Sequence, residues 1–95
     1  TTSSLSQVVI DTSPVSTYRT IKYTVQITSG TNYHCEDIII LHNGTTPKIT
    51  EFGIIYTNSS LGYFDTDING GNVELLFTPF NTSTTLKFVK TALSI

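Results

Sequence analysis

Residues 18–28, which read YRTIKYTVQIT, decide the fold class of this chain. Apolar and polar side chains alternate here without interruption: Ile21, Tyr23, Val25 and Ile27 against Thr20, Lys22, Thr24 and Gln26. Successive side chains of a β-strand point to opposite faces of the sheet, so a period of two gives one buried face and one face in water. The stretch therefore predicts a β-strand that covers a packed core.

The next apolar run, CEDIIILHN at residues 35–43, has a different pattern. Ile38, Ile39, Ile40 and Leu41 follow one another, which places apolar side chains on both faces of an extended chain. Strands that are buried on both faces have this composition. The run predicts a central strand that is covered on both sides.

The remaining apolar segments are short, and residues that favour turns separate them. Stretches rich in Gly, Asn, Ser and Pro occur at 29–30, 43–47, 57–60, 68–72 and 78–84. The segments around them are SQVVIDT, KITEFGIIYT, LGYFDTDI, VELLFT and TLKFVKTALSI, whose branched and aromatic residues suit a pleated sheet. The pattern predicts an all-β fold, an antiparallel β-sandwich or a jelly-roll-like arrangement of about seven to eight short strands.

Length and composition are those of one small domain. The chain has 95 residues, of which 38% are hydrophobic, enough for a core of two layers. The polar segment TTSSLS predicts a flexible N-terminal arm at residues 1–6, followed by a single β-sandwich domain at residues 7–95. We expect the arm to be dispensable for folding and to contribute to assembly, and residues 86–95 to be required for folding.

The charge of the chain argues against two classes of partner. Charged residues make up 13% of the sequence and the net charge is −2, so no basic surface is expected to attract nucleic acid or an anionic membrane. No apolar run approaches the roughly 20 residues that a membrane-spanning helix needs. Neither a nucleic acid nor a membrane is therefore an expected partner.

The segment YHCED at residues 33–37 is the strongest candidate for chemistry. On a strand, His34 and Glu36 share one face, whereas Tyr33, Cys35 and Asp37 share the other. His34 and His42 also share a face, but eight residues of extended chain separate them by roughly 26 Å, too far to bind one metal ion together. We therefore expect no metal site and no catalytic site here, and we expect Cys35, the only cysteine, to pack as a small apolar residue.

Two other polar features have structural interpretations. Asn43-Gly44 lies between two apolar runs, and this pair predicts a hairpin with a type I′ turn, in which both residues have positive φ. Asp65 and Asp67 lie on one face of YFDTDI and could hold calcium, yet they lack the spacing of a calcium-binding loop. A solvated strand face is the favoured interpretation of the two aspartates.

Four aromatic residues are candidates for surface contacts: Tyr33, Tyr56, Tyr63 and Phe80. Exposed aromatic rings form stacking platforms for sugars and contacts between subunits. The alternative is that these rings belong to the core. Phe80 lies in the loop TPFNTST and is the hardest of the four to explain as a core residue.

Five longer segments follow one another from residue 8 onward: VVIDTSPVSTYRTIKYTVQIT, LHNGTTPKITEFG, YTNSSLGYFDTDI, GNVELLFTP and TTLKFVKTAL. Their most distinctive parts are Ser16–Thr20 before Lys22-Tyr23, the turn His42–Thr46 before Thr50–Gly53, and Ser60–Gly62 before Phe64. In order and spacing these segments resemble a small β-rich module of virion structural proteins of tailed phages, especially marine phages and cyanophages.

The resemblance implies a component of a virion, either a capsid decoration or a part of a tail or fibre. It implies no catalytic residue. We therefore expect a non-enzymatic virion protein without a cofactor, which forms a homo-oligomer or attaches to other virion proteins. An alternative is a carbohydrate-binding or host-adhesion module that contacts a glycan of the host surface through exposed tyrosines. A third hypothesis is a small hydrolase built around Cys35 and His34.

Overall fold

The computed structural model describes residues 5–95, most of which belong to β-strands. The strands are β1 (Val8–Pro14), β2 (Tyr18–Ser29), β3 (Asn32–His42), β4 (Pro47–Tyr56), β5 (Gly62–Asn69), β6 (Asn72–Pro79) and β7 (Thr85–Ser94). Each strand corresponds to a segment predicted from the sequence. Residues 5–95 contain no helix, hence none long and apolar enough to cross a membrane. Of the predicted N-terminal arm, residues 1–4 lie outside the described part of the chain.

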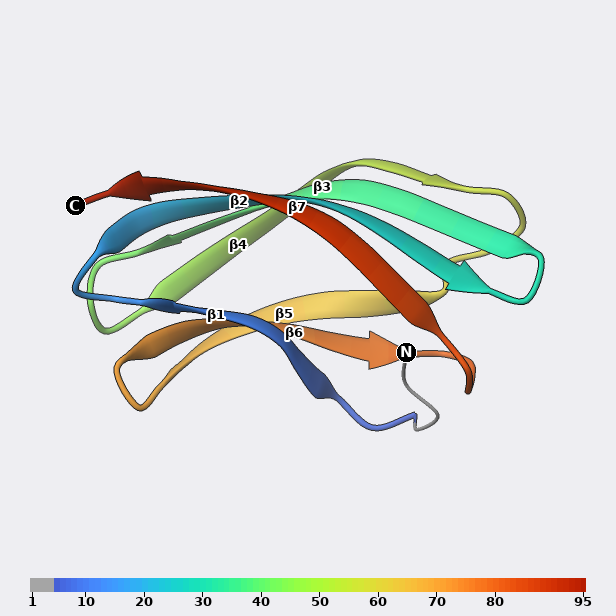
Figure 1. Ribbon diagram of the computed structural model, residues 1–95, viewed down its shortest axis with the longest axis horizontal. Helices are drawn as coiled ribbons and strands as arrows, with labels where there is room; N and C mark the ends of the chain where they lie inside the picture. The colour runs from blue at the N-terminus through green and yellow to red at the C-terminus, as the bar shows by residue number, and fades with distance from the viewer. Residues whose placement is uncertain (1–4) are drawn as a thin grey trace.

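The strands form two antiparallel sheets that pack face to face (Figure 1). One sheet has the strand order β1-β6-β5, and the other has the order β4-β3-β2-β7. Strands β2, β3 and β4 are consecutive neighbours, and β7 returns after β5 and β6 to pair with β2. A strand that returns to lie beside the first of three consecutive strands makes a Greek key. The predicted antiparallel all-β sandwich is confirmed.

The core lies between the two sheets and is built mainly by β2 and β6. The side chains of these strands that are at most 2% exposed are Ile21, Tyr23, Val25, Ile27, Val73, Leu75, Phe77 and Pro79. In β2 they are the four apolar residues of the alternating pattern, and the polar residues between them face outward. The period of two at residues 18–28 therefore predicted the buried face of this strand correctly.

A polar link joins the two sheets inside the sandwich. The Tyr23 hydroxyl donates a hydrogen bond to Asp11 Oδ2 over 2.7 Å, and Lys90 Nζ lies 2.8 Å from the same oxygen. Burial and the neighbouring Asp11 carboxylate raise the pKa of Tyr23 above its usual value. The phenol therefore stays protonated and acts as a donor from β2 to β1, while Lys90 of β7 neutralises the carboxylate.

The prediction for β3 was right about its position and wrong about its burial. The strand lies in the interior of its sheet, between β2 and β4. Its side chains alternate, however, so that Ile38 and Ile40 are buried whereas Leu41 is 49% exposed. The physical reason is that the second sheet covers only the inner face of the four-stranded sheet, and no described residue forms a third layer on its outer face. An apolar run indicates which residues could be buried, not how many layers exist to bury them.

The hairpin between β3 and β4 is confirmed, but its turn is not of type I′. His42 pairs with Pro47, so residues 43–46 form the loop. Gly44 has a φ of 99°, whereas Asn43 does not have a positive φ. The Asn43 side-chain oxygen instead accepts hydrogen bonds from the backbone N–H groups of Thr45 and Thr46, at 3.0 and 2.8 Å. An Asx turn thus closes a four-residue loop, and only its glycine needs the left-handed conformation.

Replacement of Gly44 by valine tests this turn. A Cβ at Gly44 would meet no atom within 4 Å, so the cost of Gly44→Val comes from the positive φ alone. We expect a loss of about 1–2 kcal/mol of unfolding free energy, measured by urea denaturation. Thr50→Val, on the exposed surface of β4, is the matched control and should be neutral. An unchanged unfolding free energy for Gly44→Val would contradict the left-handed conformation of this loop.

Candidate functional site

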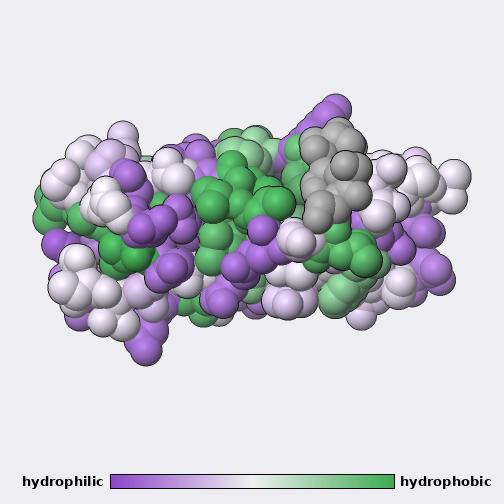
Figure 2. Space-filling view, turned by 90° about the horizontal axis from the view of Figure 1, so that it is seen from below, coloured by the Kyte–Doolittle hydropathy of each residue, from purple (hydrophilic) through white to green (hydrophobic). Residues whose placement is uncertain are grey.

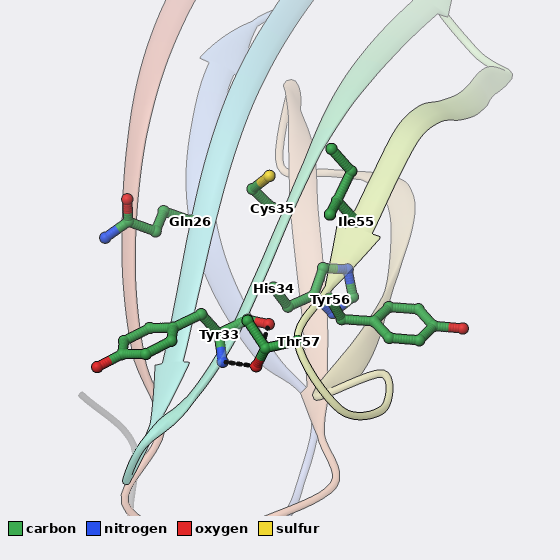
Figure 3. A pocket seen from close by; sticks show the side chains of 7 residues that line it. All are labelled: Gln26, Tyr33, His34, Cys35, Ile55, Tyr56 and Thr57. Carbon is green, nitrogen blue, oxygen red and sulfur yellow. Dashed lines mark hydrogen bonds between the residues drawn. The ribbon is translucent and has the colours of Figure 1, made fainter.

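A hollow of about 380 Å³ lies on the four-stranded sheet, where β3 begins and β4 ends (Figure 3). Its walls are formed by Gln26, Tyr33, His34, Cys35, Ile55, Tyr56 and Thr57. Gln26, Cys35 and Ile55 are cross-strand neighbours on β2, β3 and β4, so the three side chains form a row on the outer face. The hollow is therefore a feature of the uncovered face of the sheet.

Two hydrogen bonds hold the rim of the hollow in place. Thr57 N–H donates to the Tyr33 carbonyl over 2.9 Å, and Tyr33 N–H donates to Thr57 Oγ1 over 3.1 Å. These bonds continue the β3–β4 ladder by one residue beyond the end of β4. The rings of Tyr33 and Tyr56 point in opposite directions in Figure 3, and the Tyr56 ring packs against His34 at 5.6 Å between centroids. The two tyrosines therefore do not form one stacking platform.

His34 lies beneath this surface, on the inner face of β3, and is only 2% exposed. Its Nδ1 accepts a hydrogen bond from Leu61 N–H over 3.2 Å, and its Nε2 lies 2.8 Å from Glu36 Oε1. Because one nitrogen accepts, the ring is neutral and its Nε2–H donates to the carboxyl group. Burial lowers the pKa of His34 and favours the same neutral form. His34 thus binds the segment before β5 to β3.

His42 has a similar structural role at the opposite end of β3. Its Nδ1 accepts the backbone N–H of Gly44 over 3.0 Å, and its Nε2 is hydrogen-bonded to the Tyr18 carbonyl. Both histidines therefore use both ring nitrogens within the fold. They share the inner face of β3, as predicted. Among residues 5–95, no group of three or more His, Cys, Asp or Glu side chains could hold a metal ion.

Glu36 and Glu51 form a carboxyl pair that the sequence did not reveal. Glu36 is 3% exposed, and its Oε2 has no hydrogen-bond partner within the described residues. Burial raises the pKa of Glu36. Glu51 faces the same side from β4. Although this residue is exposed at the surface, desolvation of its carboxyl group and then the neighbouring Glu36 raise its pKa to about 7. Neutral His34 does not compensate two negative charges, so the pair favours retention of a proton.

The pair makes a testable prediction about pH. The pKa of Glu51 rises from its ordinary value of 4.5 to about 7 on folding, so the folded state binds more protons than the unfolded state between these values. The contribution of Glu51 to stability is therefore complete below pH 4.5 and is lost as the pH rises through 7. Glu51→Gln should have the melting temperature of the wild type in acid and a higher one above neutral pH.

The control for this measurement is Thr50→Gln, an uncharged substitution at the neighbouring exposed position of β4, whose difference from the wild type should not change with pH. The opposite pH dependence of His34 is present in both proteins and largely cancels in their difference. The prediction compares the melting temperatures of Glu51→Gln and the wild type. If their difference stays constant from acid to alkaline pH, the pKa of Glu51 is not raised.

The prediction for Cys35 was wrong. Cys35 is exposed, because the odd-numbered positions of β3 face the uncovered side of the sheet. His34 lies on the buried side, so the two residues do not form a nucleophile and base pair. The division of YHCED between two faces is confirmed. The expectation that Asp65 and Asp67 are solvated is also confirmed, because both are exposed and each accepts the backbone N–H of the residue that follows it.

All four candidate aromatic residues are exposed, but they do not form one group. Tyr33 and Tyr56 line the hollow, whereas Tyr63 and Phe80 belong to the other sheet and its following loop. The rings of Tyr63 and Phe80 contact each other, with 5.8 Å between centroids. Among the four residues, only Tyr63 and Phe80 therefore form an aromatic pair, while Tyr33 and Tyr56 line the hollow separately.

No protein-family model matches this chain, and no curated protein matches it in sequence. The exposed surfaces of the two sheets and the buried polar groups are therefore the features of the chain that bear on its function.

Proposed function

We propose that this domain is a non-enzymatic structural module of a tailed-phage virion, a capsid decoration or a tail or fibre component that joins its neighbours through its surface. The observation that carries this proposal is the exposed apolar end of strand β4. Ile54, Ile55 and Tyr56 are all at least 47% exposed, although they belong to a β-strand. Apolar side chains on an open sheet edge are a common contact surface between protein chains.

The local geometry explains why this end of β4 is exposed. Between Cys35 and Asp37 of β3 the register shifts, so that Gly53 and Ile54 together stand opposite Glu36. Gly53 has a φ of 63°, which is the left-handed conformation of a bulge. A bulge bends and twists the strand. Every residue from Thr50 to Tyr56 is exposed, so the domain itself does not cover this apolar strand end.

The location of the protein in a particle tests the proposal directly. An antiserum raised against the purified domain should label tailed particles of the phage whose genome encodes this chain, at a fixed position, in immunogold electron microscopy. Pre-immune serum and particles of an unrelated phage are the controls. Purified particles that contain none of the chain by immunoblotting would overturn the proposal.

A carbohydrate-binding or host-adhesion module is the second candidate function. The hollow beside Tyr33 favours it, because an exposed aromatic ring next to amide and hydroxyl groups is a common sugar site. Gln26 and Thr57 supply those polar groups on the same surface.

Glycan-array binding separates this candidate from the first. If the hollow binds a sugar, the wild-type domain should bind a defined set of glycans and Tyr33→Ala should lose that binding. Tyr63→Ala, on the other sheet, is the matched control and should retain it. Absence of binding at high protein concentration, or equal binding by the Tyr33→Ala variant, would exclude the hollow as the site.

A further inference from the structure

The charged side chains of the domain are divided between its two outer faces. The outer face of the four-stranded sheet carries Lys22 of β2, Lys48 of β4 and Lys87 of β7, all exposed. Its one acidic side chain among the described residues is Asp37, whose carboxylate accepts a hydrogen bond from Thr24 Oγ1 over 2.6 Å. We call this surface the basic face.

The outer face of the three-stranded sheet has the opposite charge. Asp65 and Asp67 of β5 and Glu74 of β6 point outward from it, and none of the described residues adds a basic side chain there. We call this surface the acidic face. Figure 2 looks onto it and shows hydrophilic and hydrophobic side chains interleaved. Asp11 and Lys90 form an ion pair between the two sheets, so these two charges belong to neither outer face.

The acidic face contains an unfavourable local arrangement. Asp67 and Glu74 are direct cross-strand partners. Like charges directly opposite each other on neighbouring strands destabilise a sheet. No described lysine or arginine offsets this repulsion within the domain. A positively charged surface brought against the acidic face would offset it.

Both faces also have the apolar content and the size of a protein interface. The basic face carries Leu41, Ile55, Val89 and Leu93, each at least 49% exposed, and the acidic face carries exposed Val9 and Tyr63. The molecule measures 40 × 25 × 17 Å, and the sheets are stacked along the intermediate axis, so each outer face spans about 40 by 17 Å (Figure 1). This is close to the area of roughly 800 Å² per partner that a stable contact buries.

We propose that the basic face of one copy of this domain docks on the acidic face of a second copy. Contact between two basic faces or two acidic faces would oppose like charges, so the contact joins unlike surfaces. The resulting pair keeps one basic face and one acidic face free, so the contact repeats to form a stack or, where the rotation closes, a ring. This inference depends on the proposed function as an assembly module and names the partner as the chain itself.

Sedimentation velocity of charge-reversed variants tests the contact. The wild type should associate beyond a dimer as its concentration rises at about 0.05 M NaCl, and less at about 0.5 M, where salt screens the charges. Lys22→Glu with Lys87→Glu makes both faces acidic, and Asp65→Lys with Asp67→Lys makes both faces basic. Each double variant alone should stay monomeric. An equimolar mixture of the two should associate again, because every contact then joins an acidic face to a basic one.

Two controls make the result specific. Thr45→Glu with Asn58→Glu adds negative charge to exposed loops, outside both faces, and should associate like the wild type. Circular dichroism melts should show that each variant is folded. Cys35 gives an independent readout, because it lies on the basic face and its reaction with a thiol reagent should slow several-fold as association proceeds.

Three outcomes would overturn the inference. They are a wild type that stays monomeric at every concentration, association that both double variants retain, and a mixture of the variants that stays monomeric. None of these outcomes decides the proposed function, which is tested by labelling of the particle. A virion module that binds only other proteins would not self-associate but would still be labelled in the particle. Labelled particles with no self-association would therefore separate the two proposals.

Discussion

Deletion of residues 86–95 is expected to abolish cooperative unfolding of the domain. The deletion removes nearly all of β7, which pairs with β2 from Tyr18 to Thr28. It also removes Leu86, which packs against the core, and Phe88, whose ring lies edge-on to Tyr23 at 5.7 Å between centroids. Domains of this size have about 5–15 kcal/mol of stability in total, and the loss of one strand of the core exceeds that margin. Circular dichroism and near-ultraviolet melts would show the loss directly.

Point substitutions in β7 distinguish a loss of packing from a general effect of truncation. Phe88→Ala should lower the melting temperature, whereas Val89→Ala, on the face in water, should not change it. Deletion of residues 1–6 from the other end is the control for shortening the chain and is expected to leave folding intact. A soluble and cooperatively melting protein without residues 86–95 would show that the sandwich is complete without β7.

Among substitutions of single glycines by alanine, Gly62→Ala is expected to cause the largest loss of stability. A Cβ at Gly62 would lie 2.4 Å from Cζ of Phe77 and 2.5 Å from the Thr78 carbonyl oxygen. Phe77 is fully buried, and Thr78 belongs to the central strand of its sheet, so neither can move freely. Overpacking of this kind costs about 1–3 kcal/mol, and the contact with backbone places this site at the upper end. Urea denaturation would measure it.

A double-variant cycle identifies the cause of that loss. Phe77→Leu removes the ring atoms that the new methyl group would touch, so Gly62→Ala should cost less in the Phe77→Leu background than in the wild type. Gly71→Ala is the matched control, because its Cβ would meet nothing within 4 Å and only its positive φ of 80° opposes the change. Equal effects of Gly62→Ala in the two backgrounds would mean that the Phe77 ring is not the obstacle.

The strands could be predicted because their hydrophobic patterns are local in the sequence. The number of layers in the fold could not be predicted in this way. Alternation in β2 depends on residues next to one another in sequence, and it identified the buried side chains. The run from Ile38 to Leu41 contained no information on whether a third layer exists, so its outer face was wrongly assigned to the interior. The same missing layer explains why Cys35 is exposed.

The carboxyl pair of Glu36 and Glu51 could not have been predicted from local patterns. The two residues come together only because β3 and β4 pair in a register that places Glu51 opposite Ile38, two residues along β3 from Glu36. A slip by one residue would place Glu51 on the opposite face of the sheet. The Asx turn at Asn43 has the same origin, since Asn-Gly suits several turns and the loop length selects among them. Register and loop length are properties of the folded sheet.

The return of β7 to β2 has a consequence for synthesis of the chain. Of the strands in its sheet, β7 leaves the ribosome last, after β5 and β6 of the other sheet, although its partner β2 is the first of its own sheet to be made. Until then, one edge of β2 has backbone groups without partners beside a row of branched side chains, a surface that templates aggregation. Pairing of β7 with β2 closes a long loop of chain, and contacts between residues far apart in sequence form slowly during folding. The nascent domain therefore passes through a stage in which one edge of β2 is unprotected, and its yield depends on how quickly β7 pairs with that edge.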